Sequence, residues 1–100
     1  MPFELERPWR LDRQVAIRPE PFGALAYHFG TRRLSFLKSR KLLDVVRALD
    51  DQPTALDACQ CAGVTEQELP AYRRALETLA SSGMVVEHPE RPAVEPADHA

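Results

Sequence analysis

The chain has 100 residues, of which 44% are hydrophobic and 28% charged, and its formal net charge is −2. This length fits one small domain of ordinary soluble composition, and the nearly balanced charge gives no general attraction to nucleic acid or anionic lipid. The sequence contains no run of about 18 apolar residues that could span a membrane, and its N-terminus lacks the apolar core of a signal peptide. We therefore expect a cytoplasmic protein that has no membrane partner.

The N-terminal residues 1–12 show no sustained hydrophobic period and predict an irregular arm that contains Trp9. After it, Val15 and Ile17 alternate with polar or small residues. This period-2 pattern predicts a first strand over residues 13–18 that ends before a proline.

The stretch 24–37 predicts a β-hairpin. Large and small side chains alternate over 24–29, Gly30-Thr31 fits a two-residue type II′ turn, and 32–37 forms the return strand. Four cross-strand pairs follow from this loop: Tyr27–Leu34, Leu25–Phe36, Ala26–Ser35 and His28–Arg33. One face of the hairpin is then large and apolar, and the other is small, polar or cationic. The return strand is the last of a three-strand meander, so its backbone edge is open to pairing with another chain.

Two helices are predicted directly after the hairpin. Ser39 is a suitable N-cap for a helix over residues 40–49, whose leucines and valines recur at helical spacing. Thr54 can cap a second, short helix that ends near Ala62, because Gly63 is a common stop signal.

A third helix is predicted to begin with a capping box formed by Thr65 and Glu68. Pro70 predicts a later start or a distorted first turn, because proline removes one backbone hydrogen bond. One side of this helix is apolar and carries Leu69, Tyr72, Leu76, Leu79 and Ala80. Gly83 ends the helix, and Met84–Val86 is either a short strand or an extended tail.

These elements predict one domain over residues 13–87, preceded by the arm 1–12. Residues 88–100 combine prolines with charged residues and alanine. Such a segment buries too little apolar surface to fold, so we expect a disordered tail there.

Nothing in the sequence indicates a catalytic site, a metal site or a bound cofactor. His28 has no Ser, Cys or Asp placed to work with it, which favours a structural histidine. Cys59 and Cys61 stand two residues apart on a helix, so their side chains point to different sides. They predict two buried or half-buried thiols. We therefore expect a protein that is not an enzyme.

One candidate function is DNA binding, because residues 54–80 have the helix–turn–helix cadence of winged-helix regulators. However, Glu66-Gln67-Glu68 places carboxylates where a recognition helix normally carries cations. A compact three-helix core would explain the same cadence. The charges therefore argue against a nucleic-acid partner.

The second candidate function is peptide binding by strand addition to residues 32–37. Five cations lie in or beside this strand, with no acid among them: Arg32, Arg33, Lys38, Arg40 and Lys41. The third helix, with Tyr72, Arg73 and Leu76, is the best candidate for the second wall of a groove. A cationic edge that only discourages aggregation fits the same residues equally well.

A distinctive block lies in the first half of the chain: Arg18-x-Glu20-x-Phe22-Gly23-Ala24-Leu25-Ala26-Tyr27, followed by Arg32-Arg33-Leu34-Ser35-Phe36-Leu37. It resembles the small peptide chaperones of mycofactocin biosynthesis, which are similar to the pyrroloquinoline quinone peptide chaperone. Both are recognition domains for precursors of ribosomally made, modified peptides. The resemblance covers about Phe3–Glu87, but its three-helix part is generic.

The resemblance implies an α+β, winged-helix-like domain, with a three-stranded antiparallel sheet followed by three helices. It implies that the leader of a short precursor peptide adds as a strand beside residues 32–37, in the groove shared with the third helix. The domain would then deliver this peptide to a radical S-adenosylmethionine enzyme, which modifies its C-terminal Val-Tyr end. The domain itself would be non-catalytic.

The peptide-binding residues that the resemblance and the groove predict are Arg32, Arg33, Leu34, Ser35, Phe36, Leu37, Tyr72, Arg73 and Leu76. Arg18, Glu20 and Phe22 either contact a partner or hold the turn between the first two strands. For Gly23 we favour a structural role, since glycine suits a tight bend.

Overall fold

The computed structural model describes residues 3–87, and the predicted tail 88–100 lies outside them. The fold is α+β, with a three-stranded antiparallel sheet and three helices, as predicted. Its elements in chain order are β1 (Trp9–Leu11), β2 (Val15–Glu20), β3 (Gly23–His28), β4 (Leu34–Leu37), α1 (Arg40–Ala48), α2 (Ala55–Cys61), α3 (Leu69–Ser81) and β5 (Val85–Glu87).

The prediction of an irregular N-terminal arm is wrong. Its strand β1 pairs antiparallel with β5, and Leu11 lies opposite Val85. Phe3 and Leu5 are buried in the core, and Arg7 forms an ion pair with Glu87. The N-terminal segment is therefore part of the domain. Its strand has only three residues and finds its partner at the far end of the described chain, so local periodicity carried no signal for it.

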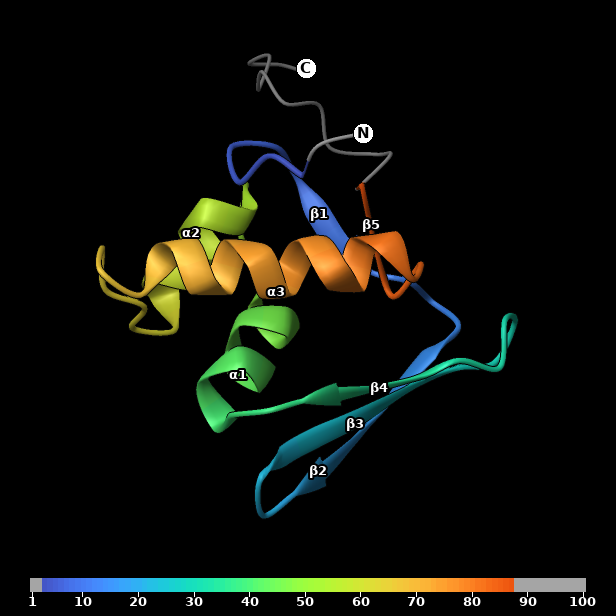
Figure 1. The fold of residues 1–100 in the computed structure, drawn as a ribbon. Coiled ribbons are helices and arrows are strands. Elements are labelled where there is room, and N and C mark those ends of the chain that lie inside the picture. Colours follow the sequence, from blue (N-terminus) through green and yellow to red (C-terminus); the bar gives the residue numbers. More distant parts are fainter. Residues whose placement is uncertain (1–2, 88–100) are drawn as a thin grey trace.

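The main sheet has the order β2-β3-β4, so β3 is central and β4 is an edge strand. In Figure 1 the helices lie on one side of this sheet, and α1 lies between α3 and the strands. Ala24 and Ala26 face inward and are fully buried, while Tyr27 and Phe36 point to the other side and are exposed. The alternation predicted two unlike faces, and the structure shows that the small one is buried. Small side chains there allow α1 to pack close to the sheet.

The predicted strand register is confirmed, but the predicted type II′ turn is wrong. The His28 N–H donates to the Arg33 carbonyl at 2.9 Å, and the Arg32 N–H donates to the His28 carbonyl at 2.7 Å. Arg32 has a φ of 63°, whereas Gly30 has no positive φ. Arg32 and Arg33 therefore belong to the loop and not to the return strand. The buried His28 ring organises this loop, since its Nδ1 accepts the N–H groups of Gly30 and Thr31.

The first strand of the main sheet runs through Pro19 to Glu20 and does not end before Pro19 as predicted. The Phe29 N–H donates to the Gln14 carbonyl at 2.8 Å, which places hydrogen-bonded pairs at even positions of β2. The nitrogen of Pro19 therefore faces away from β3. Because β2 is an edge strand, this proline costs no ladder hydrogen bond.

The helix starts largely follow the predicted caps. Ser39 Oγ accepts the Leu42 N–H at 3.0 Å, and Thr54 Oγ1 accepts the Asp57 N–H at 3.1 Å. Thr65 and Glu68 exchange the predicted capping-box bonds at 3.1 and 3.2 Å. These two residues form a turn, and α3 begins only after it. Proline is tolerated in the first turn of the helix, where a backbone N–H has no intrahelical acceptor.

Candidate functional site

The free backbone edge of β4 is the first element of the candidate site. The bond from the His28 N–H to the Arg33 carbonyl fixes which residues of β4 bond to β3. Hydrogen-bonded positions recur at every second residue of an antiparallel ladder, so Ser35 and Leu37 bond inward to β3. The N–H and C=O groups of Leu34 and Phe36 point to the open edge. No strand pairs with that edge within residues 3–87.

A cleft of about 350 Å³ lies between β4 and α3. The side chains that line it come from the β4 segment, α1 and α3: Ser35, Phe36, Lys38, Leu42, Ala75, Thr78 and Leu79. Most of these residues are apolar or small, and Lys38 adds one positive charge. The strand edge and the apolar cleft therefore adjoin one another, which is the arrangement that strand addition with side-chain recognition requires.

The α3 residues of this cleft differ from the predicted ones. Leu76 is fully buried in the core and offers no surface to a ligand. Tyr72 is half-buried, and its hydroxyl oxygen lies 3.4 Å from Ser39 Oγ. Arg73 Nη1 lies 3.7 Å from Glu77 Oε1 in an ion pair along the helix. Contacts of Tyr72 and Arg73 with a peptide stay predictions.

The residues of α3 that face β4 are Ala75, Thr78 and Leu79. Sequence reasoning placed none of these three in the groove, and it did not name Ala75 and Thr78 at all. Both have small side chains and stand one helical turn apart. This pair of small residues was the sequence signal for the cleft-lining face of α3, because small side chains leave room between a helix and a strand.

The predicted cationic cluster loses one member in the structure. Lys41 Nζ donates to Glu68 Oε1 at 3.0 Å, which ties the start of α1 to the turn before α3. This bond raises the pKa of Lys41. The backbone N–H of Thr65, and then Lys41, lower the pKa of Glu68. Lys41 therefore stabilises the fold, and the exposed cations near the β4 edge are Arg32, Arg33, Lys38 and Arg40.

The sequence model of the peptide chaperone MftB family matches residues 8–86. The match includes β4, α3 and the cleft between them. The chain belongs to the peptide chaperone MftB family. It is therefore a peptide chaperone, a non-catalytic role, and not an enzyme.

Three relatives carry the name peptide chaperone MftB. The chain is 58% identical to the one from Mycobacterium ulcerans (strain Agy99) over 84 residues, which cover 84% of this chain and 77% of the relative. The Mycobacterium tuberculosis relative is 56% identical over the same shares of both chains. The Mycolicibacterium smegmatis relative is 52% identical over 84% of this chain and 82% of its own. No solved structure matches the chain.

Three other residues, His28, Cys59 and Cys61, were considered for chemistry in the sequence, and none of them lines the cleft of this MftB-family chain. His28 is buried, and its Nε2 lies 3.6 Å from Asp12 Oδ1, so the expectation that no Asp lies beside this histidine is wrong. Its Nδ1 accepts two backbone N–H groups of the loop, in agreement with a structural role. Cys59 is buried, and burial raises the pKa of its thiol to about 11. Cys61 is exposed, so the prediction of two buried or half-buried thiols is wrong for Cys61. No group of three metal-ligating side chains comes together in residues 3–87.

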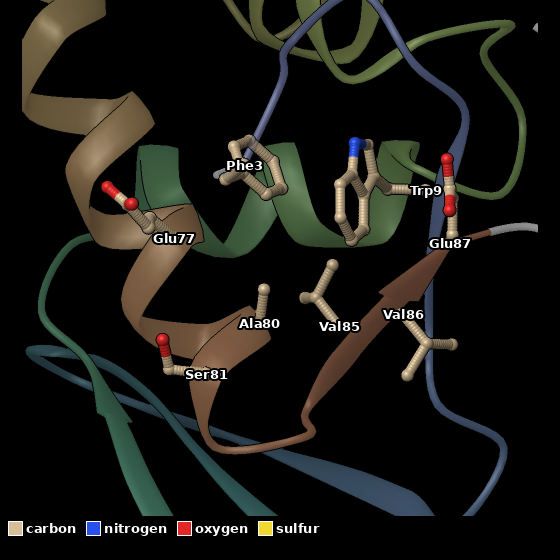
Figure 2. Close-up of a pocket in the computed structure, with 8 residues that line it drawn as sticks. All are labelled: Phe3, Trp9, Glu77, Ala80, Ser81, Val85, Val86 and Glu87. Carbon is tan, nitrogen blue, oxygen red and sulfur yellow. The ribbon is translucent and has the colours of Figure 1, made fainter. Parts of the chain in front are cut away.

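A second cleft, of about 360 Å³, lies between the C-terminal half of α3 and the β1-β5 pair. Figure 2 shows the rings of Phe3 and Trp9 side by side above Ala80 and Val85. The two ring centroids are 4.4 Å apart, and Trp9 Nε1 donates to the Glu4 carbonyl at 2.8 Å. These rings complete the core at the junction of the two chain ends. None of the described helices is long and apolar enough to cross a membrane.

Proposed function

We propose that this peptide chaperone binds the leader of the mycofactocin precursor peptide as an added strand on β4, and presents the peptide to a radical S-adenosylmethionine maturase. The observation that carries the proposal is the open edge of β4 beside the cleft against α3. Membership of the peptide chaperone MftB family supports a peptide as the partner.

The geometry divides recognition between backbone and side chains. Leu34 and Phe36 offer their N–H and C=O groups to an incoming strand, which supplies affinity for any extended peptide. Alternate side chains of that strand point to one face, and on the inner face they meet Ala75, Thr78 and Leu79. We expect the leader to place apolar residues at alternate positions there.

The charges around the edge predict the chemistry of the remaining leader residues. Arg32, Arg33, Lys38 and Arg40 are exposed along or beside β4, and Lys38 also lines the cleft. Opposite charges in the leader would accelerate association and fix its orientation. We therefore propose an acidic leader.

Calorimetry with the purified protein tests the proposal. We expect heat on titration with the full precursor peptide and none with a peptide that lacks its leader. Duplex DNA is the control for the helix–turn–helix alternative. Binding of DNA without binding of peptide would replace the proposal with a regulatory function. If both titrations are silent, a mixture with the maturase is tested next, and silence there would reject the proposal.

A pair of substitutions, one inside the cleft and one outside it, tests the cleft. Ala75→Phe fills the space between α3 and β4 and should weaken peptide binding by about tenfold or more, because it removes the pocket for a leader side chain. Gln60→Phe places the same side chain at an exposed position of α2, outside the cleft. This control should bind the peptide like the wild type.

A further inference from the structure

The outer face of the main sheet carries a continuous group of large apolar side chains, the outer-face patch. Its members are between 36% and 61% exposed: Phe22, Tyr27, Phe29, Leu34 and Phe36. Tyr27 lies opposite Leu34 in the ladder, and the half-buried Leu25 lies opposite Phe36. Ring contacts extend the patch at both ends. The ring centroids of Phe22 and Phe36 are 6.0 Å apart, and those of Phe29 and Tyr27 are 5.3 Å apart.

The outer-face patch lies on the side of the main sheet that faces away from the helices, and it meets the peptide cleft at Phe36, which also lines that cleft. The helices pack against the opposite face of the sheet, so none of them covers the outer-face patch (Figure 1). Exposed apolar patches rimmed by polar residues mark interaction sites in soluble proteins. Aromatic rings that contact one another are rigid anchors of the kind that carry binding energy at interfaces.

The charges around the patch are mostly positive. Arg18 is on the outer side of β2 and is largely exposed. Its Nε lies 2.8 Å from Glu20 Oε2. Arg32, Arg33 and Lys38 flank the patch in the loop before β4 and directly after it. A second copy of this chain would bring the same cations against them, so the rim disfavours self-association. It favours a partner with carboxylates around an apolar centre.

The shared strand β4 indicates what that partner does. The outer side chains of Leu34 and Phe36 belong to the patch, while their backbone groups form the open edge proposed for the peptide. A protein docked on the patch would therefore lie alongside a peptide added to β4. A chaperone that delivers its peptide to another protein needs the peptide and that protein to bind next to each other.

We infer that the outer-face patch is the docking surface for the protein that receives the peptide, and that this protein contributes an apolar surface rimmed by acidic residues. The inference rests on the proposed function for the identity of the receiving protein. Docking through the patch leaves the α3 side of the cleft free, where Ala75, Thr78 and Leu79 lie, so peptide and receiver bind at the same time.

Two single substitutions test the docking surface. Phe29→Glu and Phe22→Glu each place a carboxylate at an exposed position of the patch, 61% and 48% exposed, so both chains should fold. Gln60→Glu, at an exposed position of α2 that belongs to neither the cleft nor the patch, is the control for the added charge. Circular dichroism verifies the fold of each variant. The purified maturase and the precursor peptide are then titrated separately against every variant.

We expect Phe29→Glu to bind the maturase at least about tenfold more weakly and to keep wild-type affinity for the peptide. Phe22→Glu should do the same, and Gln60→Glu should match the wild type in both titrations. Unchanged maturase binding by both patch variants would overturn the inference, as would a wild type that does not bind the maturase. A wild type that binds the maturase through the patch but binds no peptide would reject the proposed function alone.

Two further measurements address other occupants of the patch. Sedimentation of the wild type alone should show a monomer. A dimer that Phe29→Glu dissociates would assign the patch to a second copy and overturn the inference. Co-sedimentation with vesicles of anionic phospholipid should show no binding, and binding that Phe29→Glu abolishes would assign the patch to a membrane surface instead.

Discussion

Gly23 lies directly against the carbonyl group of Leu37, at the point where β3 begins and β4 ends. A Cβ atom at position 23 would be 2.0 Å from that carbonyl oxygen and 2.8 Å from the backbone nitrogen of Ser39. Gly23 also has a φ of 153°, which other residues rarely adopt. The start of the central strand, the end of β4 and the N-cap of α1 therefore meet at a site where only glycine fits.

The first prediction concerns this contact. Gly23→Ala should destabilise the fold by about 3 kcal/mol or more, because the substitution adds backbone strain and forces β4 away from β3. Gly83→Ala is the matched control: Gly83 also has a positive φ, of 81°, but no atom lies within 4 Å of its added Cβ. Gly83→Ala should lower the free energy of unfolding by only about 1–2 kcal/mol. Urea unfolding measures both values, and equal costs would contradict the role assigned to the Gly23–Leu37 contact.

The second prediction separates the two edges of β4. Phe36→Pro removes an N–H that points to the open edge, so the fold should persist while affinity for the peptide falls by about tenfold or more. Ser35→Pro removes an N–H that bonds to β3 and should destabilise the fold itself. Circular dichroism and peptide calorimetry distinguish the two effects. Phe36→Ala controls for loss of the aromatic ring, and an equal loss of affinity in Phe36→Ala and Phe36→Pro would argue against strand addition.

The third prediction concerns the acidic leader. Affinity for the peptide should fall as salt is raised from about 0.05 to 0.5 M, because the screening length of exposed charges falls from more than about 10 Å to less than about 8 Å over this range. Lys38→Gln should weaken binding and flatten this salt dependence, since Lys38 lines the cleft. Arg47→Gln removes a cation on α1 outside the cleft and should change neither. Binding that is independent of salt would exclude an acidic leader.

The local features of this fold were predictable because short-range chemistry sets them. Ser39 and Thr54 cap their helices with their own hydroxyl groups, and such bonds depend only on residues two or three positions away. The pairing of Tyr27 with Leu34 followed from the period of two and from the position of the loop. Even there, the turn itself was not predictable, because the buried ring of His28 organises it.

The features that sequence reasoning missed depend on tertiary packing. Trp9–Leu11 becomes a strand only because Val85–Glu87 lies beside it, and neither segment is long enough to signal this alone. The rotation of α3 that turns Ala75 toward β4 and buries Leu76 is set by its neighbours. Periodicity likewise divides the sheet into two faces without indicating which one α1 covers.

The fourth prediction concerns the two thiols. Cys61 is exposed and Cys59 is buried, so a thiol reagent should label one site rapidly in the folded protein and two after unfolding. Burial raises the pKa of Cys59 to about 11, so the folded state retains a proton that the unfolded state loses from about pH 8.5 upward. Stability should therefore fall as the pH rises from about 8.5 toward 11, by up to about 3 kcal/mol from this group.

Cys59→Ala isolates this contribution, because the variant lacks the thiol and keeps every other titrating group. Its stability is lower at neutral pH, since it leaves a small cavity in the core. The difference from the wild type should narrow between pH 8.5 and pH 11, where the wild type alone loses the stabilisation of its buried neutral thiol. Urea unfolding at several pH values measures this difference, and a constant difference would mean that Cys59 ionises as readily in the fold as in the unfolded chain.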